Sequence, residues 1–135
     1  MAAGDRGASE EDMTRPMTGA WTATGLLAHI AFWDRFCQAR WLHAYRAKIP
    51  TPLPLEDALL ELINDADLSH WTKVPPGLAV EECLEAAETL DALIQSLGDE
   101  VAVKIEAEGR PRLINRSIHR QEHLSAIEAA FPSGA

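Results

Sequence analysis

Apolar side chains recur at helical spacing along residues 22–47, the longest pattern of this kind in the chain. Five of them lie three or four residues apart, which is the period of one helix face: Leu26, Ile30, Trp33, Cys37 and Trp41. The pattern predicts a long helix that is buried over much of its surface. Thr22 or Thr24 can cap its start, and three prolines within residues 50–54 end it.

Three shorter helices are predicted in the remainder of the chain. Each has apolar residues at the same spacing, and the segments are residues 55–66, 79–97 and 112–130. Gly98 is suited to stop the second helix, because glycine readily adopts the left-handed conformation found at helix C-termini. Pro132 closes the third.

Two segments lack a clear helical pattern. Residues 101–105 alternate in part between apolar and polar side chains, which favours an extended conformation. Residues 1–20 are rich in Gly, Ser, Thr, Pro and acids, and only residues 9–12 can cap one short turn, which Pro16 would stop. We therefore expect this N-terminal segment to be mostly irregular, with a first helix that is short or absent.

The length of the chain and the balance of its elements define the fold class. A chain of 135 residues makes one domain with a sizeable core. Much helix and little strand signal predict an all-α helical bundle. Long crossover connections at residues 48–78 and 98–111 allow helices that are not consecutive to pack together. The expected boundaries are a flexible or weakly helical segment at 1–20, the bundle at 21–131 and a tail at 132–135.

A metal-binding site is expected where two histidines, His119 and His123, lie four residues apart. On a helix this spacing places both rings on one face, so both can bind one ion. An open metal site needs a third ligand. His29 is the best candidate because it is a lone polar residue in the apolar run LLAHIAFW at residues 26–33, where an imidazole needs a partner. We predict that the two stretches face each other and that the three histidines bind a divalent metal.

Other interpretations of the histidines stay open on the sequence alone. A single buried histidine such as His29 is commonly a core residue, and a pair four residues apart on a surface helix can arise by chance. The run HRQEH at residues 119–123 also matches the inverted zinc-protease motif, in which Glu122 would be the general base. That class needs a further acidic ligand downstream and a larger domain. His43 and His70 are expected at the surface.

Three neutral imidazoles suit Zn²⁺, Ni²⁺, Co²⁺ or Fe²⁺. They leave at least one position for water or substrate, so the ion can acidify a bound water or hold a thiolate as a nucleophile. Partners beyond the ligands should orient each ring. Asp34 and Glu122 are candidates for this role, with a solvent-facing position as the alternative. Trp33, one turn after His29, is either a core residue or a wall of the metal pocket.

Three stretches of the chain carry a family resemblance. They are WTATGLLAHIAFWDR at residues 21–35, INDA at residues 63–66 before a tryptophan and a proline pair, and RSIHRQEHLSAIE at residues 116–128. They resemble the second helix, the connecting region and the last helix of DinB/YfiT-like metalloproteins, a family related to the maleylpyruvate isomerase N-terminal domain. The resemblance covers about residues 21–131.

This resemblance implies a DinB-like four-helix bundle with a divalent metal on His29, His119 and His123, and it suggests Asn64 as a further partner of the rings. In characterised relatives it implies thiol-dependent transfer or isomerisation, or hydrolysis, which introduces a low-molecular-weight thiol as a cofactor. The family normally begins with a full-length helix, and residues 1–20 depart from that pattern.

The charge of the chain argues against nucleic acid as a partner. The formal net charge is −9, whereas a protein that binds a duplex needs clustered Lys and Arg. The basic residues are scattered, except for a set beside the histidines at Arg110, Arg112, Arg116 and Arg120. This set is interpreted as a solvated flank that pairs with acids, or alternatively as an anion-recognition edge at the mouth of the site.

The two cysteines and the absence of export signals point to the cytoplasm. Cys37 and Cys83 both lie in apolar helical patterns and are expected to be reduced, buried thiols rather than a disulfide or metal ligands. The chain contains no run of eighteen apolar residues, so no membrane span is predicted. Residues 1–11 do not have the pattern of a secretory signal.

These features predict a DinB-like metal-binding protein, a metal-dependent enzyme acting on a small molecule as a thiol-dependent transferase or isomerase, or as a hydrolase. The alternative is a non-catalytic or stress-related bundle in which the ion is structural. A free coordination position beside a pocket would favour the enzyme. The neighbouring helices are not expected to cover the apolar arc of residues 22–47, which would leave Leu26, Trp33 or Trp41 exposed. Either a short helix at residues 5–19 or a second copy of the chain would cover this arc, and we favour the homodimer.

Overall fold

Helices make up most of the computed structural model, which describes residues 10–131. In chain order the elements are α1 (Glu10–Met13), β1 (Pro16–Thr18), β2 (Trp21–Thr22), α2 (Ala23–Ala47), α3 (Asp57–Trp71), α4 (Pro76–Ser96), α5 (Asp99–Ala107), the 3-10 helix η2 (Pro111–Leu113) and α6 (Ser117–Ala130). The all-α fold class is confirmed. Within the described residues, no helix has the length and apolar character needed to cross a membrane.

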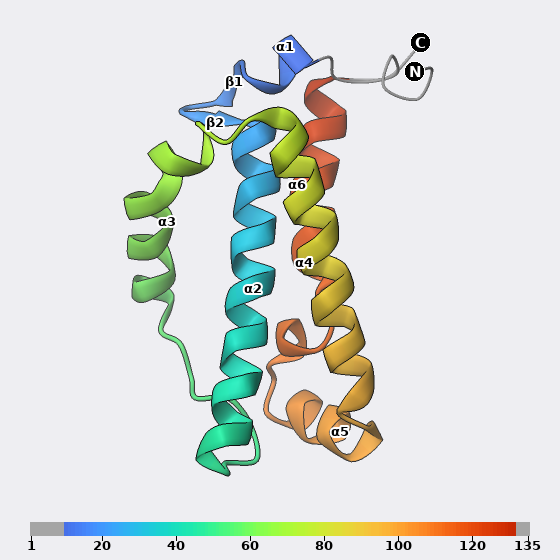
Figure 1. Cartoon of the computed structure of the whole chain (residues 1–135). Helices are drawn as coiled ribbons and strands as arrows, with labels where there is room; N and C mark the ends of the chain where they lie inside the picture. Colours follow the sequence, from blue (N-terminus) through green and yellow to red (C-terminus); the bar gives the residue numbers. More distant parts are fainter. Residues whose placement is uncertain (1–9, 132–135) are drawn as a thin grey trace.

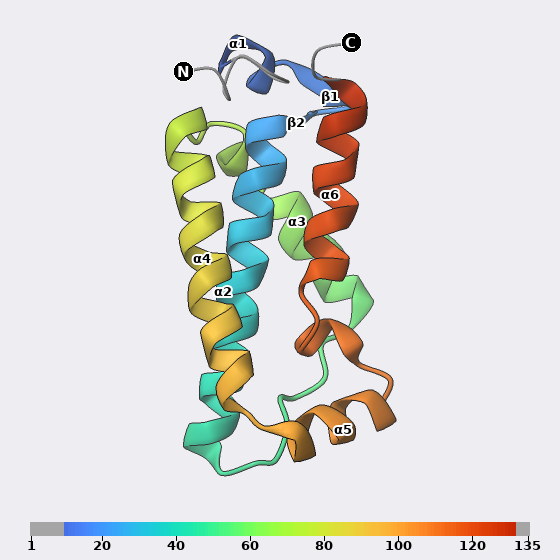
Figure 2. The ribbon, with the colours of Figure 1, turned by 90° about the vertical axis from the view of Figure 1, so that its right-hand side faces the viewer.

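Helix α2 lies at the centre of the bundle. Figure 1 shows α3 on one side of it and α4 on the other, and Figure 2 shows α6 running alongside its remaining face. The α1 turn and the β1–β2 hairpin lie at one end of the bundle, and α5 lies at the opposite end. Every long helix therefore packs against α2, so a side chain on α2 can meet residues from distant parts of the sequence.

The bounds of α2 follow from its capping residues. Thr22 Oγ1 accepts a hydrogen bond from the backbone N–H of Gly25 at 2.9 Å, which caps the helix start as predicted. A Cβ atom on Gly25 would lie only 3.0 Å from Cγ2 of Thr72, so the glycine lets α2 approach the end of α3 closely. The helix stops at Lys48, which adopts a left-handed conformation with φ of 57° before the prolines.

The C-terminal half of α2 packs into a closed hydrophobic core. Its buried members come from α2, α4, α5 and η2 and are Cys37, Trp41, Leu90, Ile105 and Leu113. The carbonyl oxygen of Leu113 accepts a hydrogen bond from Nε1 of Trp41 at 2.9 Å and one from the Cys37 thiol at 3.6 Å. This core fixes η2 against α2 and so sets the starting point of α6.

The structure corrects the prediction for residues 101–105, which lie in helix α5 and are not extended. The partial alternation of apolar side chains was misleading because only Ile105 is fully buried, while Val103 is exposed. Asp99 and Glu100 occupy the first turn of α5, where negative charge favours a helix start.

The bounds of the other helices differ from the prediction by a few residues. Helix α3 runs on to Trp71 instead of ending at residue 66, which shortens the following loop. Helix α6 begins at Ser117 because Pro111 opens the separate 3-10 helix η2. The predicted stop at Gly98 is confirmed, since this glycine has a φ of 86° just after α4.

The N-terminal part of the bundle contains a short first helix, as expected. Helix α1 is 4 residues long. The antiparallel β1–β2 hairpin, which pairs Pro16 with Thr22 and Thr18 with Trp21, was not predicted. The expectations for residues 1–9 and 132–135 lie outside the described residues.

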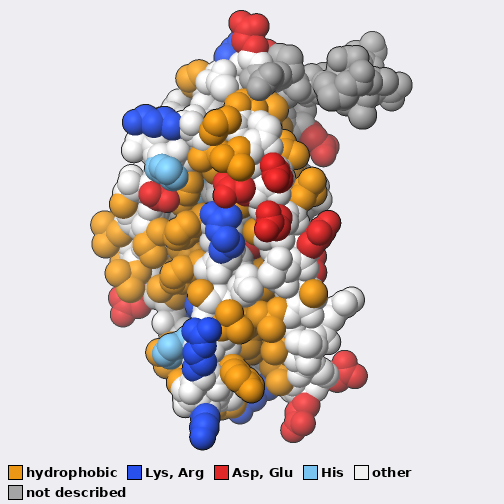
Figure 3. All heavy atoms as spheres, in the orientation of Figure 1, with side chains coloured by type: hydrophobic (Ala, Val, Ile, Leu, Met, Phe, Trp, Pro, Cys, Tyr) orange, Lys and Arg blue, Asp and Glu red, His pale blue; other side chains and the backbone are white. Residues whose placement is uncertain are grey.

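The apolar stripe that suggested a homodimer is buried within one chain. Leu26, Trp33 and Trp41 are 6%, 8% and 5% exposed, so the expectation that they lie on the surface is wrong. Exposed hydrophobic side chains occur on several helices, and Leu59 and Leu62 on α3 are two of them. Figure 3 shows hydrophobic side chains gathered at the left of the view, the side on which α3 lies in Figure 1. The homodimer stays a prediction without its original support.

Candidate metal centre

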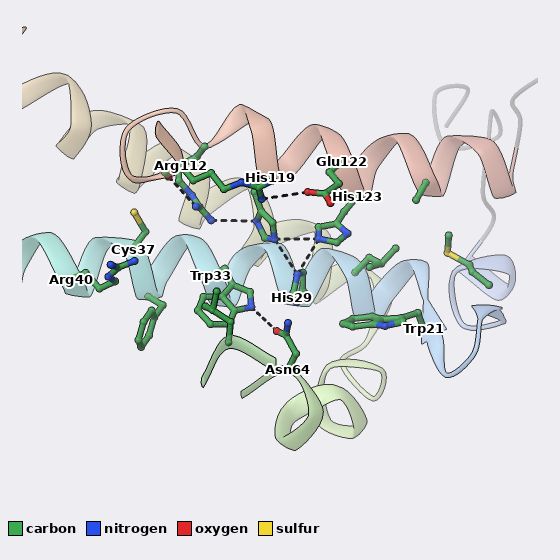
Figure 4. A pocket seen from close by; sticks show the side chains of 16 residues that line it. Trp21, His29, Trp33, Cys37, Arg40, Asn64, Arg112, His119, Glu122 and His123 are labelled. Atoms are coloured by element: carbon green, nitrogen blue, oxygen red, sulfur yellow. Dashed lines mark hydrogen bonds and ion pairs between the residues drawn. The ribbon is translucent and has the colours of Figure 1, made fainter. Parts of the chain in front are cut away.

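His29 on α2 and His119 and His123 on α6 meet with their Nε2 atoms pointing toward one another (Figure 4). The Nε2–Nε2 distances are 3.0 Å for His29–His119, 3.1 Å for His29–His123 and 3.2 Å for His119–His123. His29 and His119 are buried, and His123 is half-buried. The prediction that the two histidine stretches face each other is confirmed.

Hydrogen bonding alone does not explain this triangle of nitrogens. The Nε2 atom of a neutral imidazole either carries a proton and donates or has a lone pair and accepts. At least two of the three nitrogens are therefore of the same kind, and that pair cannot form a hydrogen bond. Three nitrogens bonded to one ion at about 2.0–2.1 Å lie about 2.9 Å apart at right angles and about 3.4 Å apart at tetrahedral angles. The observed distances fall within this range, so the triangle fits one divalent ion.

Burial keeps the rings in the neutral form that binds metals. Desolvation lowers the pKa of His29 to about 3, with further contributions from His123 and Arg116. Desolvation also lowers the pKa of His119 to about 2, and the charge of Arg116 adds to this effect. The pKa of His123 is lowered as well, mainly by burial. Near neutral pH each of the two buried rings therefore carries a single proton, so binding an ion at Nε2 would require that proton to be on Nδ1 but would release none.

The Nδ1 atoms have different surroundings. Nδ1 of His29 is buried and has no hydrogen-bond partner among the described residues. Nδ1 of His119 lies 3.3 Å from Nη2 of Arg116, a group that can only donate, so the His119 ring carries its proton on Nε2 in this arrangement. A ring that ligates through Nε2 carries its proton on Nδ1. Metal binding therefore requires Nη2 of Arg116 to move away from this nitrogen.

An ion-pair network centred on Asp34 holds α6 beside the histidines. The side chain of Asp34 is fully buried, and its two oxygens accept from Nε of Arg116 at 2.9 Å and from Nε of Arg120 at 2.8 Å. Arg120 also binds Asp91 on α4 at 3.0 Å. The network ties α2, α4 and α6 together. Asp34 was expected to orient a histidine ring directly, and it reaches His119 only through Arg116.

The other two expected ring partners are engaged elsewhere. Oδ1 of Asn64 accepts a hydrogen bond from Nε1 of Trp33 at 2.8 Å, and Oε2 of Glu122 lies 3.4 Å from Nη1 of Arg112. Neither side chain bonds to a histidine ring among the described residues, so the role of ring partner is wrong for both, and the solvent-facing alternative is confirmed for Glu122, which is exposed. His43 and His70 are exposed, as predicted.

The three histidines line a pocket of about 560 Å³ between α2, α3 and α6. Its apolar wall consists of Met17, Trp21, Leu26, Trp33, Phe36 and Leu60. Trp33 is therefore part of the pocket wall, which was one of its two interpretations. Within the described residues, the histidine cluster contains no fourth imidazole, thiolate or carboxylate.

Both cysteines are free, as predicted, but only Cys37 is buried; Cys83 is half-buried, so the expectation that both are buried is wrong for Cys83. Cys37 lines the pocket, but burial raises the pKa of its thiol. Burial also raises the pKa of Cys83. Only the thiolate acts as a nucleophile or metal ligand, so the raised pKa values disfavour both roles for the two cysteines.

Arg40 is a pocket residue that the sequence-based reasoning missed. Together with Arg112 and Arg116 it brings positive charge to the pocket. Its position on α2 offered a signal, because it follows His29 by eleven residues. Three helical turns separate the two, and the angle between them around the axis is only about 20°. An arginine on the same face of a buried helix as a candidate ligand is a reason to expect a charged pocket.

Comparison with known proteins returns no match for this chain among family models, curated proteins or solved structures. The DinB/YfiT-like resemblance therefore rests only on the motifs at residues 21–35, 63–66 and 116–128.

Proposed function

We propose that this protein is a metal-dependent enzyme acting on a small molecule, with one divalent ion on His29, His119 and His123. The observation that carries the proposal is the triangle of Nε2 atoms, 3.0–3.2 Å apart, in the wall of a pocket. This triangle supports the binding of one ion that has a free coordination position facing the pocket. The DinB/YfiT-like resemblance supports the same proposal and adds a low-molecular-weight thiol as cofactor.

Each part of the pocket has a role in this proposal. The three histidines hold the ion, which when bound supplies a Lewis acid for a water or a thiolate. Trp21 and Trp33 exclude water from the apolar side of the pocket, which strengthens electrostatic interactions within it. Asp34 fixes α6 through Arg116. Glu122 is the one carboxylate among the described lining residues, so it is the group suited to proton transfer with the substrate.

The competing proposal is an ion that only staples the helices. A structural site is typically closed by a fourth protein ligand, whereas the described cluster has three ligands and opens to a pocket. The Asp34 network already joins α2, α4 and α6 without an ion. Both observations favour the enzyme. The donor set does not select among Zn²⁺, Ni²⁺, Co²⁺ and Fe²⁺, and the cytoplasmic location and the homodimer stay predictions.

Cobalt substitution tests the proposal. Metal-free protein loaded with Co²⁺ should develop visible absorption bands, and 2-mercaptoethanol should add a sulfur-to-cobalt charge-transfer band if a coordination position is open. The His123→Ala variant, which lacks one ligand, is the control and should lose the visible bands. A visible spectrum that neither the thiol nor azide changes would contradict an open position. A spectrum that changes with azide but not with the thiol would support the open position and contradict the thiol as a cofactor.

A further inference from the structure

We propose that the pocket binds an amphipathic organic anion, with its apolar body against Trp33 and Phe36 and its carboxylate or phosphate on Arg40 and Arg112. This inference rests on the proposed function, since it names the substrate class of the same site. It is carried by an excess of positive charge at one end of the pocket, in a chain whose net charge is −9.

Three arginines line the pocket, at Arg40, Arg112 and Arg116, against one carboxylate, that of Glu122. The neutral histidines add no charge. Arg116 is already neutralised by buried Asp34, and it also donates to the carbonyl oxygen of Arg112 at 3.1 Å. The positive charge left for a ligand therefore comes from Arg40 and Arg112.

Arg40 is a half-buried cation without an acidic partner. It makes no ion pair with a carboxylate among the described residues, and its Nη2 donates to the backbone oxygen of Leu53 at 2.8 Å. Burial lowers the pKa of Arg40, and the charges of Arg110 and Arg116 lower it further. A guanidinium has five N–H donors, so several remain for an oxyanion. An anion from solution would relieve the repulsion among these cations.

Arg112 has only a weak partner. Its Nη1 lies 3.4 Å from Oε2 of Glu122, and the two side chains are 54% and 57% exposed. Exposed pairs of this kind contribute little free energy. The guanidinium can therefore exchange this contact for the planar, two-point binding that arginine offers to a carboxylate or phosphate.

The pocket has a charged end and an apolar end, with the histidines between them. Figure 4 shows Arg40 and Arg112 on one side of the histidines and Trp21 on the other, with Trp33 beside His29. On α2 the distance from His29 to Arg40 is about 16 Å along the axis, and helical side chains lean toward the N-terminus, in this case toward His29. An anion on Arg40 would place its apolar body along Trp33 and Phe36, reaching toward the candidate ion.

A second cavity continues the charged end. It has a volume of about 460 Å³, shares Arg40, Arg112 and Arg116 with the first pocket, and adds Arg110 and one carboxylate, Asp57. Arg110 is excluded from the proposal because it is bound to Glu108 at 3.0 Å and to the carbonyl oxygen of Pro52 at 2.7 Å. The shared arginines consequently lie at the border of the two cavities.

Calorimetric titration of the metal-free protein tests the inference. The probes are 4-phenylbutyrate, 4-phenylbutyl phosphate and the neutral 4-phenylbutyramide, which share one apolar body. We expect at least one anion to bind about tenfold more tightly than the amide, in line with a charge-assisted hydrogen bond. Arg40→Gln and Arg112→Gln should each remove most of that preference and leave amide binding unchanged. The tighter of the two anions identifies the preferred group.

The matched control is Arg35→Gln, which removes an exposed arginine of α2 that lies 3.8 Å from Glu82 and does not line the pocket. Equal binding of the acids and the amide would contradict the inference. An equal loss of preference in Arg35→Gln would do so as well, since the effect would then be one of net charge. Arg112 is exposed, so its variant should fold even if Arg40→Gln does not. Because no metal is present, these outcomes are independent of whether the histidines bind an ion.

Discussion

The two halves of α2 bury polar atoms in different ways. In the C-terminal half, Trp41 and Cys37 both bond to the carbonyl oxygen of Leu113 inside a closed hydrophobic core. In the N-terminal half, Nδ1 of His29 has no partner among the described residues, and its Nε2 faces two other histidine nitrogens. Burial of an unpaired polar group is unfavourable. The C-terminal half therefore pairs its buried polar atoms within the protein, whereas the three Nε2 atoms beside the N-terminal half cannot all be paired with one another.

Asp34 lies between the two halves, and its removal has the largest expected effect. Asp34→Ala removes the fully buried carboxylate that the half-buried guanidinium groups of Arg116 and Arg120 share, which should lower the free energy of unfolding by about 3–5 kcal/mol. Urea denaturation measures the change. Asp91→Ala removes the exposed partner of Arg120 and should lower it by no more than about 1 kcal/mol. Equal effects of the two substitutions would mean that the buried carboxylate contributes no more than the exposed one to holding α2, α4 and α6 together.

The histidine cluster beside the N-terminal half of α2 should make stability depend on pH. The folded pKa values of His29 and His119 lie below the unfolded value of about 6.5. At acid pH the unfolded chain takes up protons that the folded protein does not, so this stability is present above pH 6.5 and is lost as the pH falls. The loss between pH 7 and pH 5 should be about 2 kcal/mol for each of these histidines.

Denaturation of the metal-free protein at several pH values measures this loss. The variant His119→Leu should show a shallower dependence, because one of the two titrating rings is gone. A slope in the variant as steep as that of the wild-type protein would assign the acid sensitivity to other groups.

Substitutions in the two halves should change stability in opposite directions when no metal is bound. Trp41→Phe removes a donor to the carbonyl oxygen of Leu113 and should destabilise the protein by about 1–2 kcal/mol. His29→Leu removes a buried nitrogen that has no partner and should stabilise the metal-free protein by about 1 kcal/mol. Thermal unfolding of both variants measures the difference. Destabilisation by His29→Leu equal to that by Trp41→Phe would show that the N-terminal half is complete without an ion.

The smallest expected effect lies at the far end of α2. Lys48 adopts a left-handed conformation with φ of 57°, which is unfavourable for a residue with a Cβ atom. Lys48→Gly should raise the free energy of unfolding by about 0.5 kcal/mol, since glycine adopts this conformation without strain. Metal affinity should not change. A loss of metal binding in this variant would show that the two halves of the helix are coupled.

Much of the histidine cluster could be predicted from local sequence. The i, i+4 spacing of His119 and His123 depends only on helix geometry, and His29 stood out as a lone polar side chain in an apolar run. His29 and His119 are 90 residues apart in the chain. Their pairing was indicated by the need of the buried His29 ring for a polar partner and by the family resemblance. The structure agrees with the arrangement, and metal binding itself stays a prediction.

The surroundings of the cluster could not be predicted in the same way. The contacts of Asn64 with Trp33 and of Asp34 with Arg116 depend on how α3 and α6 turn about α2, which no local pattern encodes. The pocket position of Arg40 depends on the connection after α2, whose Leu53 oxygen binds its guanidinium. Long-range packing decided each of these positions.

The central claim is that the three histidines hold one divalent ion. Elemental analysis of protein purified without a metal-affinity tag tests it most directly. We predict about one divalent ion per chain in the wild-type protein and none in His29→Ala. The same loss is expected in His123→Ala, which removes the half-buried ligand. Full occupancy in His29→Ala, or a wild-type protein that takes up no ion after dialysis against Zn²⁺, Ni²⁺, Co²⁺ and Fe²⁺, would contradict the three-histidine site.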